Sequence, residues 1–321
     1  MKTLTALLST LLVASATLLG VAPAQAETTN IAFVVKDMTN PYYWRMRAGA
    51  EEAAAEKDIN LLWTAAQFNG DIQGQIGIVE SQLVRQPDAL VLVPMNATAL
   101  CPKVRQANRQ GVPVINPDTR LAAENCGDSA TFVGLDEKAL AVQLAEFVVE
   151  ETGGEANVAI LEGFRGSSTA EDRLEGFVEV FDQYDGMNVV ASSTAEWDRE
   201  KGLKVTEDFL QAHPDLDVIV ASNDQMALGA IQAVKSAGKA DQIEVVGVDA
   251  IPAALDALRN GELLATVDGN TDRVGYESVM AAYAVAAEGA DDLPAWTKVP
   301  SRILLQEDVT EEYLQSRGIE P

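Results

Sequence analysis

Histidine and cysteine are scarce in this sequence of 321 residues, which contains one histidine and two cysteines. His213 alone cannot form the histidine clusters of common catalytic and zinc sites, and the two cysteines show no Cys-x-x-Cys spacing. No P-loop, Gly-x-Ser-x-Gly elbow, His-Glu-x-x-His or Gly-x-Gly-x-x-Gly motif is present. We therefore expect no metal, no cofactor and no histidine-based catalysis.

Basic residues are few compared with acidic ones. The chain carries 23 Lys and Arg against 49 Asp and Glu, a formal net charge of -26 at pH 7. Such an acidic surface repels phosphate polymers and anionic lipid, so we expect no nucleic-acid partner. Hydrophobic residues make up 47% and charged residues 22%, which is typical of a globular protein, and the length favours two lobes.

Long apolar runs are absent except near the N-terminus, where Leu4–Val21 follows Lys2 and precedes Ala24-Gln25-Ala26. A basic residue, an apolar stretch and a small-x-small site are typical of a Sec signal peptide. We expect cleavage after Ala26, with residues 1–26 as the signal peptide, and export to the periplasm. A membrane anchor is the alternative, but the run contains several Ser and Thr and lacks a basic stop-transfer flank.

The two cysteines would then enter a compartment that oxidises thiols. Cys101 opens a predicted helix and Cys126 lies in the loop after the next predicted strand, so a Cys101–Cys126 disulfide is the economical interpretation. Closing that loop is worth about 3 to 4 kcal/mol in the chain-entropy model. Two reduced thiols are the alternative, and a metal site is less favoured.

Short β-branched runs alternate with longer segments of helical periodicity, which is the pattern of βαβ units. Nearly all the runs are apolar throughout, as strands buried on both faces of a parallel sheet require. The predicted strands are Ile31–Lys36, Asn60–Thr64, Ala89–Val93, Val112–Asn116, Thr131–Leu135, Asn157–Glu162, Asn188–Thr194, Asp217–Ala221, Ile243–Val248, Leu263–Val267 and Lys298–Leu305. So many strands fit two sheets better than one.

The two halves of the chain also resemble each other. Ala89–Asp118 and Asp217–Asp249 each run strand, polar turn, helix, Gly, strand and Asp. Ligands bind at the carboxyl ends of strands in open α/β sheets, so two facing lobes would line one cleft with their polar strand ends. The predicted fold class is therefore α/β, with two doubly wound parallel-sheet lobes.

Aromatic side chains lie at two of the predicted strand ends. The segment Asn40-Pro41-Tyr42-Tyr43-Trp44 follows the first strand, and Trp197 precedes Asp198 at a later strand-to-helix junction. Aromatic faces suit the C–H surface of a sugar or cyclitol ring. The alternative is packing within their own lobe, and for Trp44 we favour a core-facing helix stripe.

Four polar residues, Asp118, Arg173, Asn223 and Asp249, complete a hydroxyl-binding set at the strand ends. Carboxylates, amides and guanidinium groups supply fixed acceptors and donors for a polyol in a closed cleft. Each has a simpler interpretation: Arg173 could pair with a neighbouring glutamate on a solvated helix, and Asp249 could cap the next helix. Their shared position at strand ends favours the cleft.

At these residues the sequence resembles the periplasmic sugar-binding proteins of the ribose and galactose type, which have the type I periplasmic binding fold. The similarity spans essentially the whole mature chain. The matching segments are Ile31–Val35 with Asn40–Tyr43, Gly166–Arg173 with Glu175–Phe177, Trp197–Gly202, Asn223–Gly229 and Val246–Asp249.

The resemblance implies two lobes joined by a three-segment hinge, with crossovers near Leu135, Gly269 and Lys298. The N-terminal lobe would comprise 27–135 plus 270–298, and the C-terminal lobe 136–269 plus 299–321. A monosaccharide or related polyol would bind between the lobes, and an ABC permease would receive the closed form of a monomer. The implied ligand-binding residues are Asn40, Tyr42, Tyr43, Asp118, Phe164, Arg173, Trp197, Asn223, Asp249 and, at the hinge, Asn270.

Three departures from the ribose-type pattern make ribose itself a doubtful ligand. Val93 replaces an Asn, Thr119 replaces an Arg that here stands one place later as Arg120, and Gly269 replaces a hinge Gln. The galactose-type calcium loop is absent, so the resemblance adds no metal.

We therefore expect an exported solute-binding protein for ABC transport, without catalysis. Alternatives are a periplasmic sensor or chemoreceptor, including one for a furanosyl quorum signal, and a periplasmic carbohydrate enzyme. The adjacent Glu171 and Asp172 do not form a convincing acid–base pair, because neighbouring helix residues point about 100° apart. A transcription repressor is disfavoured by the export signal.

Overall fold

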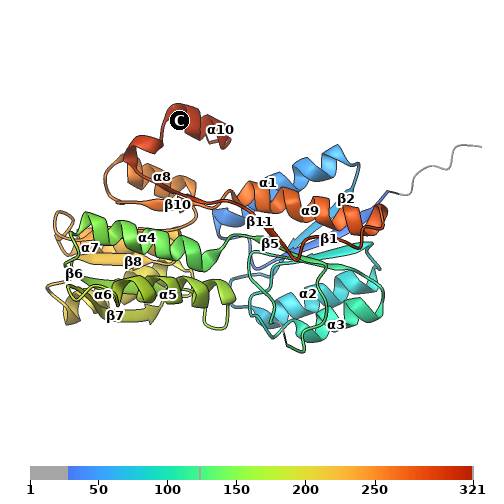
Figure 1. Cartoon of the computed structure of the whole chain (residues 1–321), viewed down its shortest axis with the longest axis horizontal. Helices are drawn as coiled ribbons and strands as arrows, with labels where there is room; N and C mark the ends of the chain where they lie inside the picture. The colour runs from blue at the N-terminus through green and yellow to red at the C-terminus, as the bar shows by residue number, and fades with distance from the viewer. Residues whose placement is uncertain (1–27, 123, 320–321) are drawn as a thin grey trace, which may run out of the picture.

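The structure is a computed structural model that describes residues 28–122 and 124–319, and the predicted signal peptide lies outside these residues. Two α/β lobes lie end to end along the longest axis of the molecule (Figure 1). Within the described ranges, no helix is both long enough and apolar enough to span a bilayer.

The first lobe contains a six-stranded parallel sheet in the order β11-β5-β4-β3-β1-β2. The strands are β1 (Asn30–Val35), β2 (Asn60–Ala65), β3 (Ala89–Leu92), β4 (Val114–Pro117), β5 (Thr131–Gly134) and β11 (Trp296–Lys298). The helices are α1 (Pro41–Glu56), α2 (Ile72–Val84), α3 (Cys101–Arg109) and α9 (Thr271–Ala287). Helices α1 and α9 cover one face of the sheet, and α2 and α3 cover the other (Figure 1).

The second lobe contains a four-stranded parallel sheet in the order β7-β6-β8-β9. The strands are β6 (Ala156–Glu162), β7 (Met187–Thr194), β8 (Val218–Ala221) and β9 (Glu244–Val246). The helices are α4 (Glu137–Glu151), α5 (Ser168–Phe181), α6 (Arg199–Ala212), α7 (Asp224–Ser236) and α8 (Pro252–Arg259). The chain ends with the antiparallel pair β10 (Thr266–Asp268) and β12 (Arg302–Leu304), the 3-10 turn η1 (Gln306–Asp308) and α10 (Glu311–Ser316).

Strand β1 illustrates why continuous apolar runs form these sheets. Ile31, Phe33 and Val35 pack in the core under α1 and α9, whereas Ala32 and Val34 pack in the core on the side of α2 and α3. A strand covered on both faces has no solvent side, so it needs no polar alternation. The predicted fold of two parallel α/β sheets is confirmed.

The chain passes between the lobes at three places: between β5 and α4, between β10 and α9, and between β11 and β12. The prediction of one continuous strand over Lys298–Leu305 is wrong. Residues 296–298 pair with β5 in the first lobe, and residues 302–304 pair with β10. Between them lies Pro300, which has no N–H to continue a ladder and whose carbonyl accepts a hydrogen bond from Asn270.

The predicted disulfide is present. Cys101 at the start of α3 is bonded to Cys126 in the loop after β4, and both side chains are buried in the core on the α2 and α3 side of the first sheet. The bridge therefore fastens the loop between β4 and β5 to the helix layer of its own lobe.

Helices α1 and α9 approach each other closely because two glycines lie at their interface. A Cβ atom added to Gly275 of α9 would lie 1.9 Å from the Met46 carbonyl oxygen of α1. One added to Gly49 would lie 1.8 Å from the carbonyl oxygen of Asp272. Any side chain at either position forces the two helices apart, because backbone atoms cannot rotate out of the way.

We expect Gly275→Ala to lower the free energy of unfolding by about 1 to 3 kcal/mol, as overpacking does in other tightly packed interiors. Gly77→Ala on α2 is the matched control, since a Cβ there meets nothing within 4 Å. It should raise stability by up to about 1 kcal/mol through helix propensity. Urea unfolding measures the free energy of unfolding of both variants. The same change in Gly275→Ala and Gly77→Ala would contradict close packing of α1 on α9.

Candidate ligand-binding site

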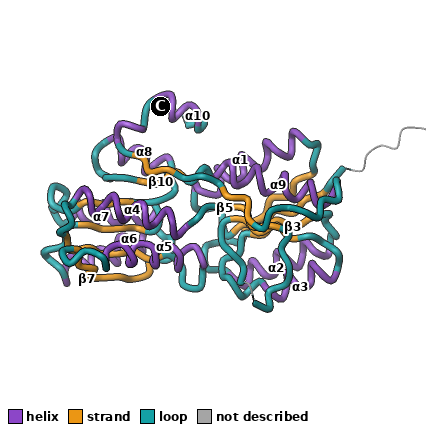
Figure 2. The backbone as a smooth tube through the Cα atoms, in the orientation of Figure 1, coloured by secondary structure: helices purple, strands orange, loops and turns teal. Residues whose placement is uncertain are grey.

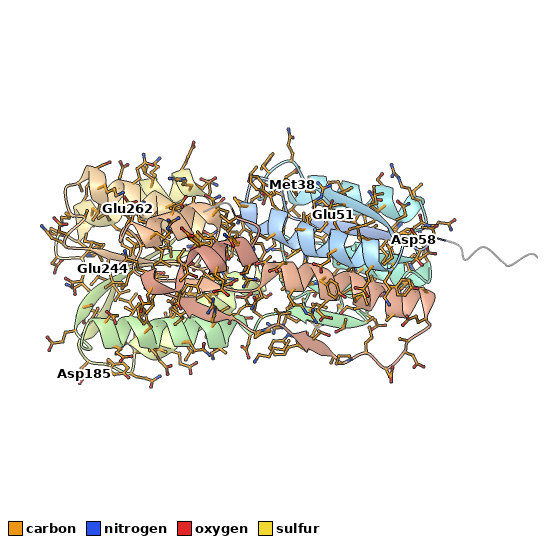
Figure 3. The ribbon with its side chains drawn as sticks, turned by 90° about the horizontal axis from the view of Figure 1, so that it is seen from above. Met38, Glu51, Asp58, Asp185, Glu244 and Glu262 are labelled. Carbon is orange, nitrogen blue, oxygen red and sulfur yellow. A yellow bond between two sulfur atoms is a disulfide. The ribbon has the colours of Figure 1, made fainter. Side chains whose placement is uncertain are left out.

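Both sheets direct the carboxyl ends of their strands toward the junction of the lobes. The order β2-β1-β3-β4 in the first lobe is repeated as β7-β6-β8-β9 in the second. In such sheets the point where the strand order reverses, between β1 and β3 or between β6 and β8, is open to a ligand. Loop segments separate the two sheets there (Figure 2). Met38, just after β1, lies toward the middle of the molecule, whereas Asp58, just before β2, lies at the outer end (Figure 3).

A cleft of about 430 Å³ lies at this junction and draws its walls from both lobes. Its size is within the range of small-molecule sites. The structure brings eight of the predicted site residues to it: Asn40, Tyr42, Tyr43, Asp118, Arg173, Trp197, Asn223 and Asp249. These residues are separated by up to 209 positions in the sequence, so only the folding of both lobes assembles them.

Asp118 is the centre of the first-lobe wall. Its Oδ1 accepts a hydrogen bond of 2.6 Å from the Tyr42 hydroxyl, and its Oδ2 lies 3.1 Å from the Lys36 ammonium. Lys36 also donates to the Thr119 hydroxyl at 2.6 Å. Burial alone would raise the pKa of Asp118, but the Lys36 charge and these hydrogen bonds outweigh it and hold the pKa below its usual value. The carboxylate is therefore ionised and can accept ligand hydroxyls.

Tyr42 and Tyr43 form an aromatic corner at the start of α1. Their ring planes are perpendicular and their centroids lie 5.2 Å apart. The local cause is the helix start: Asn40 caps α1 by accepting the Tyr42 N–H, and Pro41 occupies the first turn. Burial is the first cause that raises the pKa of both tyrosines, and the negative charge of Asp118 is the second. Both hydroxyls therefore remain neutral.

Arg173 dominates the second-lobe wall, and it is only 3% exposed. Its Nε donates to Glu137 Oε2 at 2.8 Å, its Nη1 donates to the Ser222 carbonyl, and Asp249 Oδ1 lies 3.7 Å from Nη1. The predicted alternative, pairing with a neighbouring glutamate on a solvated helix face, is wrong. The helical period turns Arg173 inward instead, so it meets a carboxylate 36 positions away in the chain.

The carboxyl groups around Arg173 are held in a poorly hydrated region. Burial is the main cause that raises the pKa of Asp249 and of Glu137, with Arg173 opposing it in both cases. Burial also raises the pKa of Asp224 to about 7. Asp224, and not Asp249, binds the Ile251 N–H at 3.0 Å before α8, so the suggested capping role of Asp249 is wrong.

Asn223 and Trp197 complete the second-lobe wall. Asn223 Oδ1 caps α7 by accepting the Met226 N–H at 3.0 Å, which fixes the direction of its amide. Trp197 lies 5.7 Å from the Arg173 guanidinium carbon, measured to the ring centroid. Trp197, Asp118 and Asp249 all have positive φ, of 64°, 65° and 120°. Such backbone strain in non-glycine residues clusters at binding sites, where the surrounding contacts hold it.

Two predicted site residues do not line the cleft. Phe164 lies in the loop between β6 and α5, and a Cβ added to Gly70 of the first lobe would lie 3.4 Å from its ring. Asn270 lies at the second crossover, where its amide binds the Pro300 carbonyl and the Arg317 guanidinium. The expectation that Trp44 packs in the core is wrong: its side chain is 55% exposed, and its indole N–H donates a hydrogen bond to the Met38 carbonyl.

Several lining residues were missed by the sequence reasoning. They are Lys36, Asp37, Thr39, Phe68, Asn69, Thr169, Glu196, Asp198, Arg199, Lys201 and Gln225. The signal that could have found Lys36 and Asp37 is their place directly after an apolar strand, which is the same argument that selected Asn40. Phe68 and Asn69 follow β2 after two intervening residues, Ala66 and Gln67.

The two buried cations of the cleft, Lys36 and Arg173, are already neutralised. Lys36 faces Asp118, and Arg173 faces Glu137 and Asp249. An anionic ligand would therefore have to compete with buried carboxylates, whereas a neutral molecule with many hydroxyls can share their donors and acceptors. In the described part of the chain, no group of three or more His, Cys, Asp or Glu side chains is arranged to hold a metal ion.

Two doubly wound lobes, three crossovers and a polar cleft with aromatic walls define the class of bilobal solute-binding proteins. The sequence model of the family described as periplasmic binding protein domain matches residues 31–291 of this chain. The D-ribose/D-allose-binding protein of Pseudomonas aeruginosa is 35% identical over 272 residues, which cover 82% of this chain and 84% of that protein. The chain belongs to the periplasmic binding protein family, and its relatives are binding proteins, as expected for a protein without catalysis.

Solved structures agree with this assignment. An ABC transporter periplasmic solute-binding protein from Actinobacillus succinogenes, with bound D-allose, superposes with a TM-score of 0.83 at 31% identity and covers 88% of this chain and 99% of its own. An ABC transporter solute-binding protein from Bacillus halodurans, with bound myo-inositol, superposes with a TM-score of 0.83 at 30% identity, covering 92% and 99%.

We expect Arg173→Met to lower the free energy of unfolding of the ligand-free protein by about 3 kcal/mol at pH 7, because buried Glu137 and Asp249 would lose their counter-ion. Arg173 lowers the pKa of both carboxyls, so its removal should raise both pKa values further than burial already does. The folded variant then gains more from protonation than the folded native protein does, and the deficit should shrink as the pH falls below 7.

Arg165→Met is the control for this substitution, since Arg165 belongs to the connection before α5 and its side chain is 75% exposed. It should leave the urea midpoint unchanged at both pH values. A deficit of Arg173→Met that grows on acidification would contradict the buried ion cluster.

Proposed function

We propose that this protein captures a neutral monosaccharide or cyclic polyol between its lobes in the periplasm and presents the closed form to an ABC permease. The observation that carries the proposal is the convergence of buried donors and acceptors from both lobes beside aromatic rings. A ligand that bonds both walls favours the closed state, because only in that state does it contact both lobes at once.

The individual roles follow from hydrogen-bonding capacity. Asp118 is the acceptor for hydroxyls on the first-lobe side, and Arg173 and Asn223 are the donors on the second-lobe side. Tyr42, Tyr43 and Trp197 cover the apolar faces of the ring. A hydroxyl missing from the ligand would leave one of these buried groups without a partner, which is how such a site discriminates between epimers.

The ligand class is supported by charge and by similarity. Lys36 and Arg173 are compensated within the protein, which disfavours uronates and sugar phosphates. Relatives at about one-third identity are named for ribose and allose, and one structural neighbour holds myo-inositol. D-Allose, D-ribose and myo-inositol are therefore the first ligands to test.

In a thermal-shift panel, at least one of D-allose, D-ribose and myo-inositol should raise the melting temperature of the mature protein. A ligand at 100 times its Kd stabilises the folded state by about 2.7 kcal/mol. D-Galacturonate and ribose 5-phosphate should give smaller shifts, because the buried cations Lys36 and Arg173 are already paired and the exposed Arg199 at the cleft is well hydrated. Stabilisation by the anions alone would contradict the proposal.

We expect Trp197→Ala to weaken binding of the best panel ligand by about tenfold or more, since a ring face in the cleft is lost. Trp44→Ala is the matched control, because Trp44 is an exposed tryptophan that does not line the cleft. Isothermal titration should give the same Kd for Trp44→Ala and the native protein. Equal weakening by both substitutions would argue against the cleft as the binding site.

A further inference from the structure

Arg120 makes contacts between the lobes but does not line the cleft. It follows β4 and the Asp118-Thr119 pair, at the rim of the first lobe. Its Nη1 lies 2.9 Å from Asp172 Oδ2, and its backbone N–H donates to the Ser168 hydroxyl at 2.8 Å. Both partners belong to α5 of the second lobe, so this one residue joins the two lobes through its side chain and its backbone.

The guanidinium of Arg120 is held in place by its own lobe. Its carbon lies 4.4 Å from the ring centroid of Phe132 in β5 and 4.7 Å from that of Trp296 in β11. A planar guanidinium stacks well on aromatic faces, which a lysine ammonium does not reproduce. Because β5 and β11 are neighbours in the first sheet, this aromatic cradle does not depend on the position of the second lobe.

We propose that Arg120 is a positioning residue for ligand capture, a latch that closes the cleft onto α5 through Asp172 without touching the ligand. The pair joins the two lobes, and moving α5 away from the first lobe would break it, so the pair favours the closed state over the open one. The cradle holds the guanidinium in advance, and little side-chain freedom is lost when the latch forms. Its role in capture rests on the proposed function, although its effect on closure does not.

The size of the effect follows from exposure. The side chains of Arg120 and Asp172 are 35% and 31% exposed, so the pair is partly screened by water. Removing it should lower the closed-to-open ratio by about two- to fivefold. Because apparent affinity scales with the fraction of binding-competent protein, a ligand's Kd should rise by the same factor.

The test uses ligand-free mature protein, so it is independent of any sugar. Asn69 Nδ2 donates to the Glu196 carbonyl across the cleft at 2.7 Å, and both native cysteines are in the disulfide. Replacing these two residues in Asn69→Cys/Glu196→Cys adds one thiol to each lobe. The rate at which a short bifunctional thiol reagent cross-links them reports the closed population, even where it is small.

Three variants are made in the cysteine-pair background: Arg120→Ala, Asp172→Ala and both together. Each should slow cross-linking by about two- to fivefold, the factor expected for the closed-to-open ratio. Non-additivity identifies a direct pair. Arg120→Lys should give an intermediate rate, since it keeps the charge and loses the stacking. The control is Arg47→Ala, which breaks the 2.7 Å pair with Glu51 inside α1 and should leave the rate unchanged.

Unchanged cross-linking in Arg120→Ala and Asp172→Ala, with cooperative thermal unfolding retained, would overturn the latch. Additive slowing in the double substitution would also overturn it, because the two residues would then act separately. Failure of the whole sugar panel together with slowed cross-linking would count against the proposed function and leave the latch supported.

Discussion

The buried ion cluster around Arg173 is the constraint on which the site depends. Arg173 comes from α5, Glu137 opens α4 directly after the first crossover, and Asp249 follows β9. Three segments far apart in the chain are therefore held at one point beside the cleft. Because a buried charge without a partner is costly, the cluster tolerates little displacement of any of these elements. The position of the second-lobe wall follows from it.

The first-lobe wall is organised by a second charged group. Asp118 is ionised and bonded by Lys36 and Tyr42, and its backbone is held in the left-handed region. The two clusters lie on opposite walls, and each is compensated within its own lobe. Ligand hydroxyls and the smaller rim contacts are left to decide whether the lobes close.

Much of the architecture could be predicted from the sequence because parallel sheets buried on both faces leave a strong pattern. Continuous apolar strands, Asn40-Pro41 at a helix start and the repeated strand-helix-strand-Asp unit each have a local cause. The same reasoning selected Asp118 and Asn223, which lie one and two residues beyond the ends of β4 and β8. It failed at Lys298–Leu305, where apolar content alone could not reveal that Pro300 marks a change of lobe.

By itself, the sequence determined the fold class, the edge of each sheet that carries polar residues and the two residues of the disulfide, since all of these follow from local order along the chain. Only the tertiary structure decided which side chains share a wall. Arg173 turned inward to Glu137, Trp44 stayed in solvent, and Asn270 bonded the hinge instead of the cleft. The physical reason is that partner choice depends on distances between segments that the sequence separates widely.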